Sequence, residues 1–165
     1  MPQSRSFLLV CLGNICRSPL AEAALRDAAA RAGVAIGVDS AGTGAWHVGN
    51  PPDPRSQTVA LAHGIDISGY RARQVAAADY RRFTDILALD RDNLSELRRR
   101  APKDATARIA LLMDAVPGRN GQAVADPYYG DAAGFEVTWA DVSEAAEAIV
   151  AELHAERRSR EGGNP

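Results

Sequence analysis

A cysteine and an arginine with complementary chemistry stand close together near the start of the sequence, in VCLGNICRSP at residues 10–19. Cys11 and Arg17 are separated by five residues. A thiolate is a nucleophile, and a guanidinium presents a planar set of donors to a tetrahedral oxyanion. Gly13 and Asn14 tolerate left-handed backbone conformations, so the loop can curl and turn its peptide N–H groups inward. This spacing predicts a nucleophile at the floor of an oxyanion site.

The elements on either side of this loop support that prediction. Residues 7–10 form a continuous apolar run, which is typical of a strand buried on both faces of a parallel sheet. Ser18 is a good N-cap, Pro19 fits the first helical position, and Gly33 ends the apolar helical spacing that follows. A helix N-terminus binds anions through its unpaired N–H groups and its dipole. An ordinary buried cysteine at a strand end is the alternative, but it would need none of the surrounding glycine, asparagine, arginine and serine.

Strands and helices are expected to alternate along the rest of the chain. Further strands are predicted at residues 36–41, 85–90 and 108–113, and helices after Asp53, after Asp90 or Asp92, and from about residue 142 to 153. This order predicts a single-domain, three-layer α/β fold with a doubly wound parallel sheet and helices on both faces. Ligands bind such sheets beyond the carboxyl ends of the strands, where Cys11 is expected to lie.

Composition excludes several classes of function. The chain has 165 residues, of which 46% are hydrophobic and 24% charged, with a formal net charge of −2. We expect one domain at residues 1–157 with a flexible tail at 158–165, and neither nucleic-acid nor membrane binding. Cys11 and Cys16 are the two cysteines, so a disulfide framework and a four-ligand zinc site are not expected, and no metal or cofactor is predicted. A cytoplasmic location is expected.

The motif CLGNICRSP resembles the active-site signature of the low-molecular-weight protein tyrosine phosphatases. The similarity extends to DSAGT at residues 39–43, WHVGNPPDPR at 46–55, ARQ at 72–74 and DPYYG at 126–130. This resemblance implies a four-stranded parallel sheet, the Rossmann-like phosphotyrosine phosphatase I fold. It also implies a metal-independent enzyme that hydrolyses phosphotyrosine in proteins, with a bacterial tyrosine kinase as one candidate partner, acting as a monomer or weak dimer.

The resemblance also assigns roles to individual residues. Cys11 would attack phosphorus and form a cysteinyl phosphate, while Arg17 and the loop amides hold the equatorial oxygens. Asp126 would act as general acid and then as base, with Asp131 as the reserve candidate. The implied substrate-binding residues are the remaining loop residues and three aromatic residues of the cleft walls: Leu12, Gly13, Asn14, Ile15, Cys16, Ser18, Trp46, Tyr128 and Tyr129.

Three further residues have roles that the resemblance suggests less directly. Ser40 matches a supporting hydrogen-bond shell that also includes Asn14 and Ser18. Tyr70 stands where the family usually has a histidine bonded to the loop asparagine, and its hydroxyl could substitute as a donor. Cys16 is either a small filler in the loop or the partner of Cys11 in a protective disulfide under oxidation.

Three other functions are compatible with parts of this pattern. Arsenate reduction uses the same oxyanion site, but it needs thiols outside the loop or an external thiol. A phosphotyrosine- or phosphate-binding module would need neither Asp126 nor a reactive Cys11. A redox sensor would use the pair of Cys11 and Cys16 as its output, without phosphate turnover.

Overall fold

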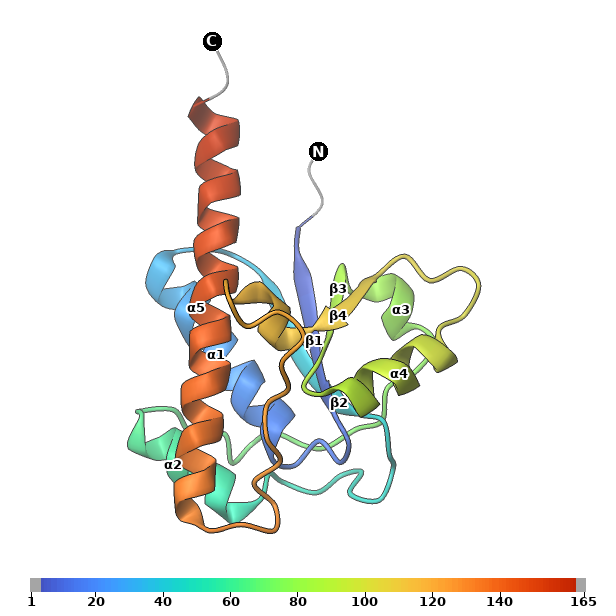
Figure 1. The fold of residues 1–165 in the computed structure, drawn as a ribbon, viewed down its shortest axis with the longest axis vertical. Helices are drawn as coiled ribbons and strands as arrows, with labels where there is room; N and C mark the ends of the chain where they lie inside the picture. Colours follow the sequence, from blue (N-terminus) through green and yellow to red (C-terminus); the bar gives the residue numbers. More distant parts are fainter. Residues whose placement is uncertain (1–3, 163–165) are drawn as a thin grey trace.

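A four-stranded parallel sheet lies at the centre of residues 4–162, the part of the chain that the computed structural model describes (Figure 1). Its strand order is β2-β1-β3-β4. The strands are β1 (Ser6–Cys11), β2 (Gly37–Gly42), β3 (Asp85–Ala88) and β4 (Arg108–Leu111). Cys11 pairs with Gly42, and Val10 with both Ala41 and Ala88. The predicted α/β fold with four parallel strands is confirmed.

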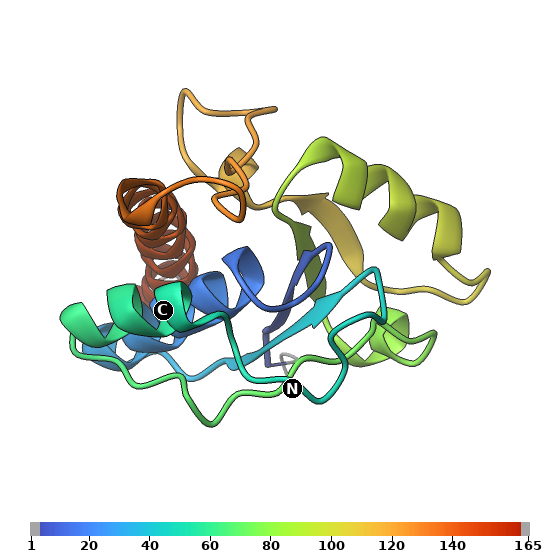
Figure 2. The same cartoon turned by 90° about the horizontal axis from the view of Figure 1, so that it is seen from below.

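Helices cover both faces of the sheet (Figure 2). One face packs against α1 (Arg17–Ala32), α2 (Pro54–Ala62) and α5 (Ala132–Gly162), and the other against α3 (Asp79–Arg82) and α4 (Arg91–Arg100). After Ser6, the strand β1 is apolar because its side chains alternate between two cores. Phe7, Leu9 and Cys11 join the first core, while Leu8 and Val10 join the second.

The start of α1 differs from the sequence-based expectation. The helix begins at Arg17, with Cys16 at the N-cap position and no side-chain cap, rather than at Pro19 after a Ser18 cap. The Ser18 hydroxyl is unavailable for capping because it contacts Cys11 and Asn14 in the preceding loop. The predicted end is confirmed, since Gly33 adopts the left-handed conformation with φ 69°.

Two aspartates cap the helices that follow β2 and β3. Asp53 accepts a hydrogen bond from the backbone N–H of Arg55 at 2.8 Å, as expected for the cap of α2. Asp90, and not Asp92, caps α4 by accepting from the N–H of Asn93 at 2.7 Å. The third and fourth strands are shorter than expected, since β3 ends at Ala88 and a 3₁₀ turn (Leu112–Ala115) follows β4. The short helix α3 was not expected.

The last helix is longer than its apolar stripe indicates. The predicted tail begins at residue 158, whereas α5 continues through Gly162 (Figure 1). Residues 163–165 of that tail lie outside the described residues. Within residues 4–162, no helix combines the length and the hydropathy needed to cross a bilayer.

The chain reverses direction along the sheet between β1 and β3. From β1 it crosses to β2 on one side, and from β3 it crosses to β4 on the other. The carboxyl ends of β1 and β3 therefore flank a topological switch point, where doubly wound sheets bind ligands. Cys11 ends β1 and Asp90 follows β3, so both residues lie beside this crevice.

Candidate active site

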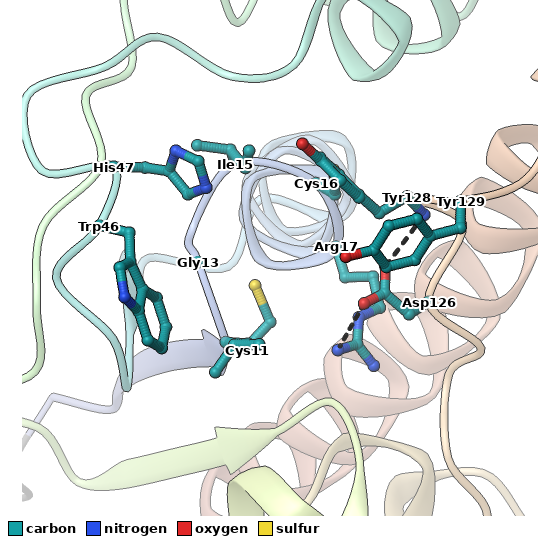
Figure 3. Close-up of a pocket in the computed structure, with 11 residues that line it drawn as sticks. Cys11, Gly13, Ile15, Cys16, Arg17, Trp46, His47, Asp126, Tyr128 and Tyr129 are labelled. Carbon is teal, nitrogen blue, oxygen red and sulfur yellow. Dashed lines mark hydrogen bonds and ion pairs between the residues drawn. The ribbon is translucent and has the colours of Figure 1, made fainter.

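A cavity of about 200 Å³ opens at the carboxyl end of β1 (Figure 3). The sulfur of Cys11 points into it, with Trp46 and His47 on one side and Asp126, Tyr128 and Tyr129 on the other. The lining residues are Cys11, Leu12, Gly13, Ile15, Cys16, Arg17, Trp46, His47, Asp126, Tyr128 and Tyr129. Among the described residues, no group of three or more His, Cys, Asp or Glu side chains is placed to hold a metal ion.

The side chain of Asn14 fixes the shape of the 11–18 loop. Asn14 has φ 59°, so the loop turns through a left-handed residue as its composition predicts. Its Nδ2 atom donates to the hydroxyl oxygens of Ser18 at 2.8 Å and Ser40 at 3.0 Å. Its Oδ1 atom accepts from the backbone N–H of Arg73 at 3.0 Å. Asn14 and Ser18 are therefore buried behind the loop and do not line the cavity with their side chains.

The hydroxyl of Ser18 is directed at the candidate nucleophile. Its oxygen lies 3.0 Å from the sulfur of Cys11 and accepts a hydrogen bond from Asn14. Because that acceptor position is used by Asn14, the Ser18 proton can be donated to the sulfur. A hydrogen bond of this kind stabilises a thiolate more than a thiol.

Two residues orient the guanidinium of Arg17: Asp90 at the N-cap of α4, and Val124 in the loop that precedes α5. Its Nη1 atom donates to Oδ2 of Asp90 and to the carbonyl oxygen of Val124, both at 2.8 Å. Arg17 is only 3% exposed, so these contacts orient a buried cation. Sequence reasoning treated Asp90 only as a helix cap. Its position after a strand, at the carboxyl edge of the sheet, was the signal for a second role.

Asp126 lies at the rim of the cavity, beside the guanidinium (Figure 3). Its Oδ2 atom is 3.7 Å from Nη2 of Arg17, and its Oδ1 atom accepts from the backbone N–H of Tyr128 at 3.0 Å. The reserve candidate Asp131 does not line the cavity, and its carboxylate lies 3.4 Å from the backbone N of Gly134. The fold thus brings Asp126, rather than Asp131, to the cavity that contains Cys11.

Aromatic side chains surround the mouth of the cavity. Trp46 is 72% exposed, Tyr128 39% and Tyr129 94%, so they form an open rim rather than deeply buried walls. His47 also lines the cavity and was not predicted to do so, although it follows Trp46 in the sequence. Its Cδ2 atom lies 3.0 Å from where a Cβ on Gly13 would be placed. A side chain at Gly13 would therefore press against His47.

A second layer of polar side chains continues from Ser40 away from the cavity. The Ser40 hydroxyl donates to Oε1 of Glu22 at 2.7 Å, and Nε of Arg26 donates to Oε2 at 2.9 Å. Burial raises the pKa of Glu22, while Ser40 and Arg26 oppose this effect. Burial, and after it the charge of Glu22, also raises the pKa of Tyr70. The backbone N–H of Arg73, rather than a Tyr70 hydroxyl, satisfies Oδ1 of Asn14.

The second cysteine has a different environment from the first. Cys16 is 5% exposed, and burial, followed by Asp53, Cys11 and Asp126, raises its pKa to about 12. Cys16 therefore remains a neutral thiol at physiological pH, and a neutral thiol is a poor nucleophile. Both cysteines are free in this structure.

Comparison with known proteins assigns the family. The model of the low molecular weight phosphotyrosine protein phosphatases matches residues 6–159. The chain belongs to this family. The resemblance carried by the sequence motifs is thereby confirmed, and the chain is a cysteine-based hydrolase of the phosphatase class.

Individual members of the phosphatase family are similar along almost their whole length. The low molecular weight protein-tyrosine-phosphatase YfkJ of Bacillus subtilis is 41% identical over 155 residues, which cover 93% of this chain and 98% of YfkJ. The structure of an Entamoeba histolytica protein tyrosine phosphatase has a TM-score of 0.86 at 33% identity, covering 93% of this chain and 99% of that one. DARP, the drosophila arginine phosphatase, has a TM-score of 0.83 at 30% identity, covering 90% and 97%.

Proposed function

We propose that this chain hydrolyses phosphotyrosine in proteins through a phosphate ester of Cys11, with Asp126 as the proton donor and acceptor and without a metal ion. The observation that carries the proposal is the placement of Cys11, Arg17 and Asp126 around one cavity, with the hydroxyl of Ser18 3.0 Å from the sulfur. A nucleophile, an oxyanion binder and an acid are the groups that metal-independent phosphomonoester hydrolysis through a covalent intermediate requires.

In the first step the thiolate of Cys11 attacks phosphorus opposite the phenolic oxygen. The S–P bond forms as the P–O bond breaks, while the amides of the 11–18 loop and Arg17 hold the three equatorial oxygens. Asp126, as the carboxylic acid, gives its proton to the departing oxygen, so tyrosine leaves as a neutral phenol. The position of Asp126 at the rim, away from the Cys11 floor, supports this assignment.

In the second step water replaces the sulfur. Asp126 is now a carboxylate and accepts a proton from the attacking water, whose oxygen forms a bond to phosphorus as the S–P bond breaks. Inorganic phosphate leaves, and Cys11 and Asp126 return to their starting protonation states. The hydrogen bond from Ser18 and the adjacent loop amides stabilise the thiolate as the leaving group.

The aromatic rim favours an aryl phosphate as substrate. Trp46, Tyr128 and Tyr129 present ring surfaces at the mouth, and these suit the phenyl ring of phosphotyrosine. Phosphoserine is shorter and lacks a ring for these residues to contact. DARP, which has this fold, is named an arginine phosphatase, so phosphoarginine is the competing substrate to compare.

We further propose that the physiological substrate is a phosphotyrosine protein of the cytoplasm, with a bacterial tyrosine kinase as one candidate. The open rim supports a protein substrate, because it leaves room for a peptide chain around the phosphorylated residue. We propose that the enzyme acts as a monomer or weak dimer. Capture of phosphoproteins from a cell extract by the Cys11→Ser variant, competed by vanadate, would identify the substrate.

The decisive experiment is hydrolysis of phenyl phosphate and of phosphotyrosine, phosphoserine and phosphoarginine peptides in the presence of EDTA. We expect phosphotyrosine to be hydrolysed, and Cys11→Ser and Arg17→Ala to lose nearly all activity. Asp126→Ala should lose about 10²-fold or more in kcat/KM with phenyl phosphate, and less with 4-nitrophenyl phosphate, whose leaving group needs no proton. Full activity in Cys11→Ser, loss of native activity in EDTA, or a preference for phosphoarginine would contradict the proposal.

A further inference from the structure

Arg55 connects the 11–18 loop and the 126–131 loop, which lie more than 100 residues apart in the sequence. It stands in the first turn of α2, and α2 packs beside the amino-terminal turns of α5 (Figure 1). The 126–131 loop, which contains Asp126, leads directly into α5. Arg55 does not line the cavity, and the catalytic steps above do not use it.

One part of the Arg55 side chain contacts the 126–131 loop. Its Nη1 atom donates to the carbonyl oxygen of Gly130 at 3.3 Å. The guanidinium carbon lies 5.5 Å from the centre of the Tyr128 ring and 4.6 Å from that of Phe135 in the first turns of α5. These are cation–π distances, so Arg55 holds the loop through both its backbone and its aromatic side chain.

The other part of the guanidinium is fixed to the 11–18 loop through Asp53. Its Nε and Nη2 atoms donate to Oδ1 and Oδ2 of Asp53 at 3.1 and 3.0 Å. These hydrogen bonds lower the pKa of Asp53, so its carboxylate is ionised at neutral pH. The backbone N–H of Asp53 donates to the carbonyl oxygen of Ile15 at 2.8 Å. A continuous set of contacts therefore runs from Ile15 through Asp53 and Arg55 to Gly130.

We propose that Arg55 is a positioning residue that holds the 126–131 loop, and with it Asp126, at a fixed place over Cys11. This proposal rests on the proposed role of Asp126 as the general acid. Arginine suits the task because its planar group contacts Asp53, Gly130 and two ring faces at once, which the single ammonium of lysine cannot do. A loop that carries a catalytic acid gains most from such a contact, because small displacements of a reacting group reduce its contribution.

The kinetic test compares Arg55→Met and Arg55→Lys with native protein on two leaving groups. We expect kcat/KM with phenyl phosphate to fall about tenfold in Arg55→Met, and by less than about twofold with 4-nitrophenyl phosphate. Arg55→Lys should lie near Arg55→Met. Combined with Asp126→Ala, Arg55→Met should cause little further loss, because the positioned acid is already absent. Equal losses with both leaving groups, or a full additional loss in the double variant, would overturn the proposal.

A matched control and a non-kinetic measurement complete the test. Arg81 is also a partly exposed arginine paired with an aspartate, Asp104, and Arg81→Met should leave both rates unchanged. Amide hydrogen exchange of the segment that spans residues 126–131 should become about tenfold faster in Arg55→Met and stay native-like in Arg81→Met. Unchanged hydrogen exchange of this segment in Arg55→Met would show that Arg55 does not hold the 126–131 loop, whatever the kinetics show. If Asp126→Ala retains native rates, the proposed role of Asp126 as general acid is wrong. The role of Arg55 is tested separately, because hydrogen exchange reports whether Arg55 holds the 126–131 loop.

Discussion

Asp90 accepts a 2.8 Å hydrogen bond from Nη1 of Arg17 across the switch point between β1 and β3. The same carboxylate caps α4 through its other oxygen, so its own orientation is fixed by the backbone. Because Nη1 of Arg17 is fixed by hydrogen bonds, the other N–H groups of the guanidinium point in a defined direction. The orientation of Arg17 in the cavity therefore depends on a residue that does not line the cavity.

Replacement of Asp90 should separate its two roles. Asp90→Ser retains a capping hydroxyl but removes the Arg17 contact, whereas Asp90→Ala removes both. We expect kcat/KM to fall about 10- to 100-fold in both variants, since Arg17 loses its orienting partner. Asp90→Ala should unfold with about 1 kcal/mol less free energy than Asp90→Ser in urea titration. Activity of Asp90→Ser within twofold of native would show that Val124 alone orients Arg17.

Removal of the Ser18 hydroxyl should make Cys11 less reactive. A hydrogen bond to a charged group contributes about 1.5–3 kcal/mol, so Ser18→Ala should slow alkylation of Cys11 by iodoacetamide at pH 6 by about tenfold or more. Ser56→Ala is the control, because its buried hydroxyl bonds the carbonyl oxygen of Cys16 at 3.3 Å and not the sulfur of Cys11. Equal alkylation rates in the two variants would contradict this role of Ser18.

Two substitutions of Asn14 should distinguish its backbone conformation from its side-chain contacts. Both Asn14→Gly and Asn14→Ala lose the hydrogen bonds to Ser18 and Ser40, so both should lose activity. Alanine at φ 59° carries an additional cost of about 1–2 kcal/mol that glycine avoids. Chemical denaturation should therefore find Asn14→Ala less stable than Asn14→Gly. The reverse order would show that the loop relaxes out of the left-handed conformation.

The burial of Cys16 predicts a loss of stability at alkaline pH. Burial raises its pKa from 9.0 to about 12 in the folded protein, so the unfolded chain releases this proton first. The contribution of Cys16 is fully present below pH 9 and is lost as the pH rises toward 12, at up to about 1.4 kcal/mol per pH unit.

The measurement for Cys16 is the free energy of unfolding of native protein and Cys16→Ala between pH 8 and about 10.5, with reductant present. Other groups that titrate in this range affect both proteins alike. The native protein should therefore lose stability more steeply than the variant. Parallel slopes would mean that Cys16 ionises without an effect on folding.

The features predicted correctly from the sequence are those with strong local signals. The apolar run before Cys11 predicts β1, and the glycine and asparagine after it predict the left-handed turn at Asn14. Gly33 marks the end of α1, and Asp53 marks the start of α2. Each signal comes from a few neighbouring residues whose backbone preferences and burial agree with the final fold.

The features that sequence reasoning missed depend on contacts between distant segments. Asp90 has the local pattern of a cap, and nothing near it indicates that Arg17 lies within hydrogen-bond distance. The backbone N–H of Arg73 reaches Asn14 across 59 residues, where a Tyr70 hydroxyl was considered as the donor. Ser18 has the sequence pattern of a helix cap, but its hydroxyl contacts the sulfur of Cys11 instead, and α1 starts earlier than predicted. At Ser18 a tertiary contact replaces the local capping preference, whereas Asp90 keeps its cap and adds the contact to Arg17.

The helices that follow the 11–18 and 126–131 loops pack against each other along one face of the sheet. The helix α1 leaves the 11–18 loop, α5 leaves the 126–131 loop, and both contribute alanines to the same core, among them Ala24, Ala28, Ala145 and Ala146. Small side chains allow a close approach of the helix axes, so the separation of Cys11 and Asp126 is coupled to the spacing between α1 and α5. A bulkier residue at one of these alanines would move the 11–18 and 126–131 loops apart while leaving every side chain of the cavity unaltered.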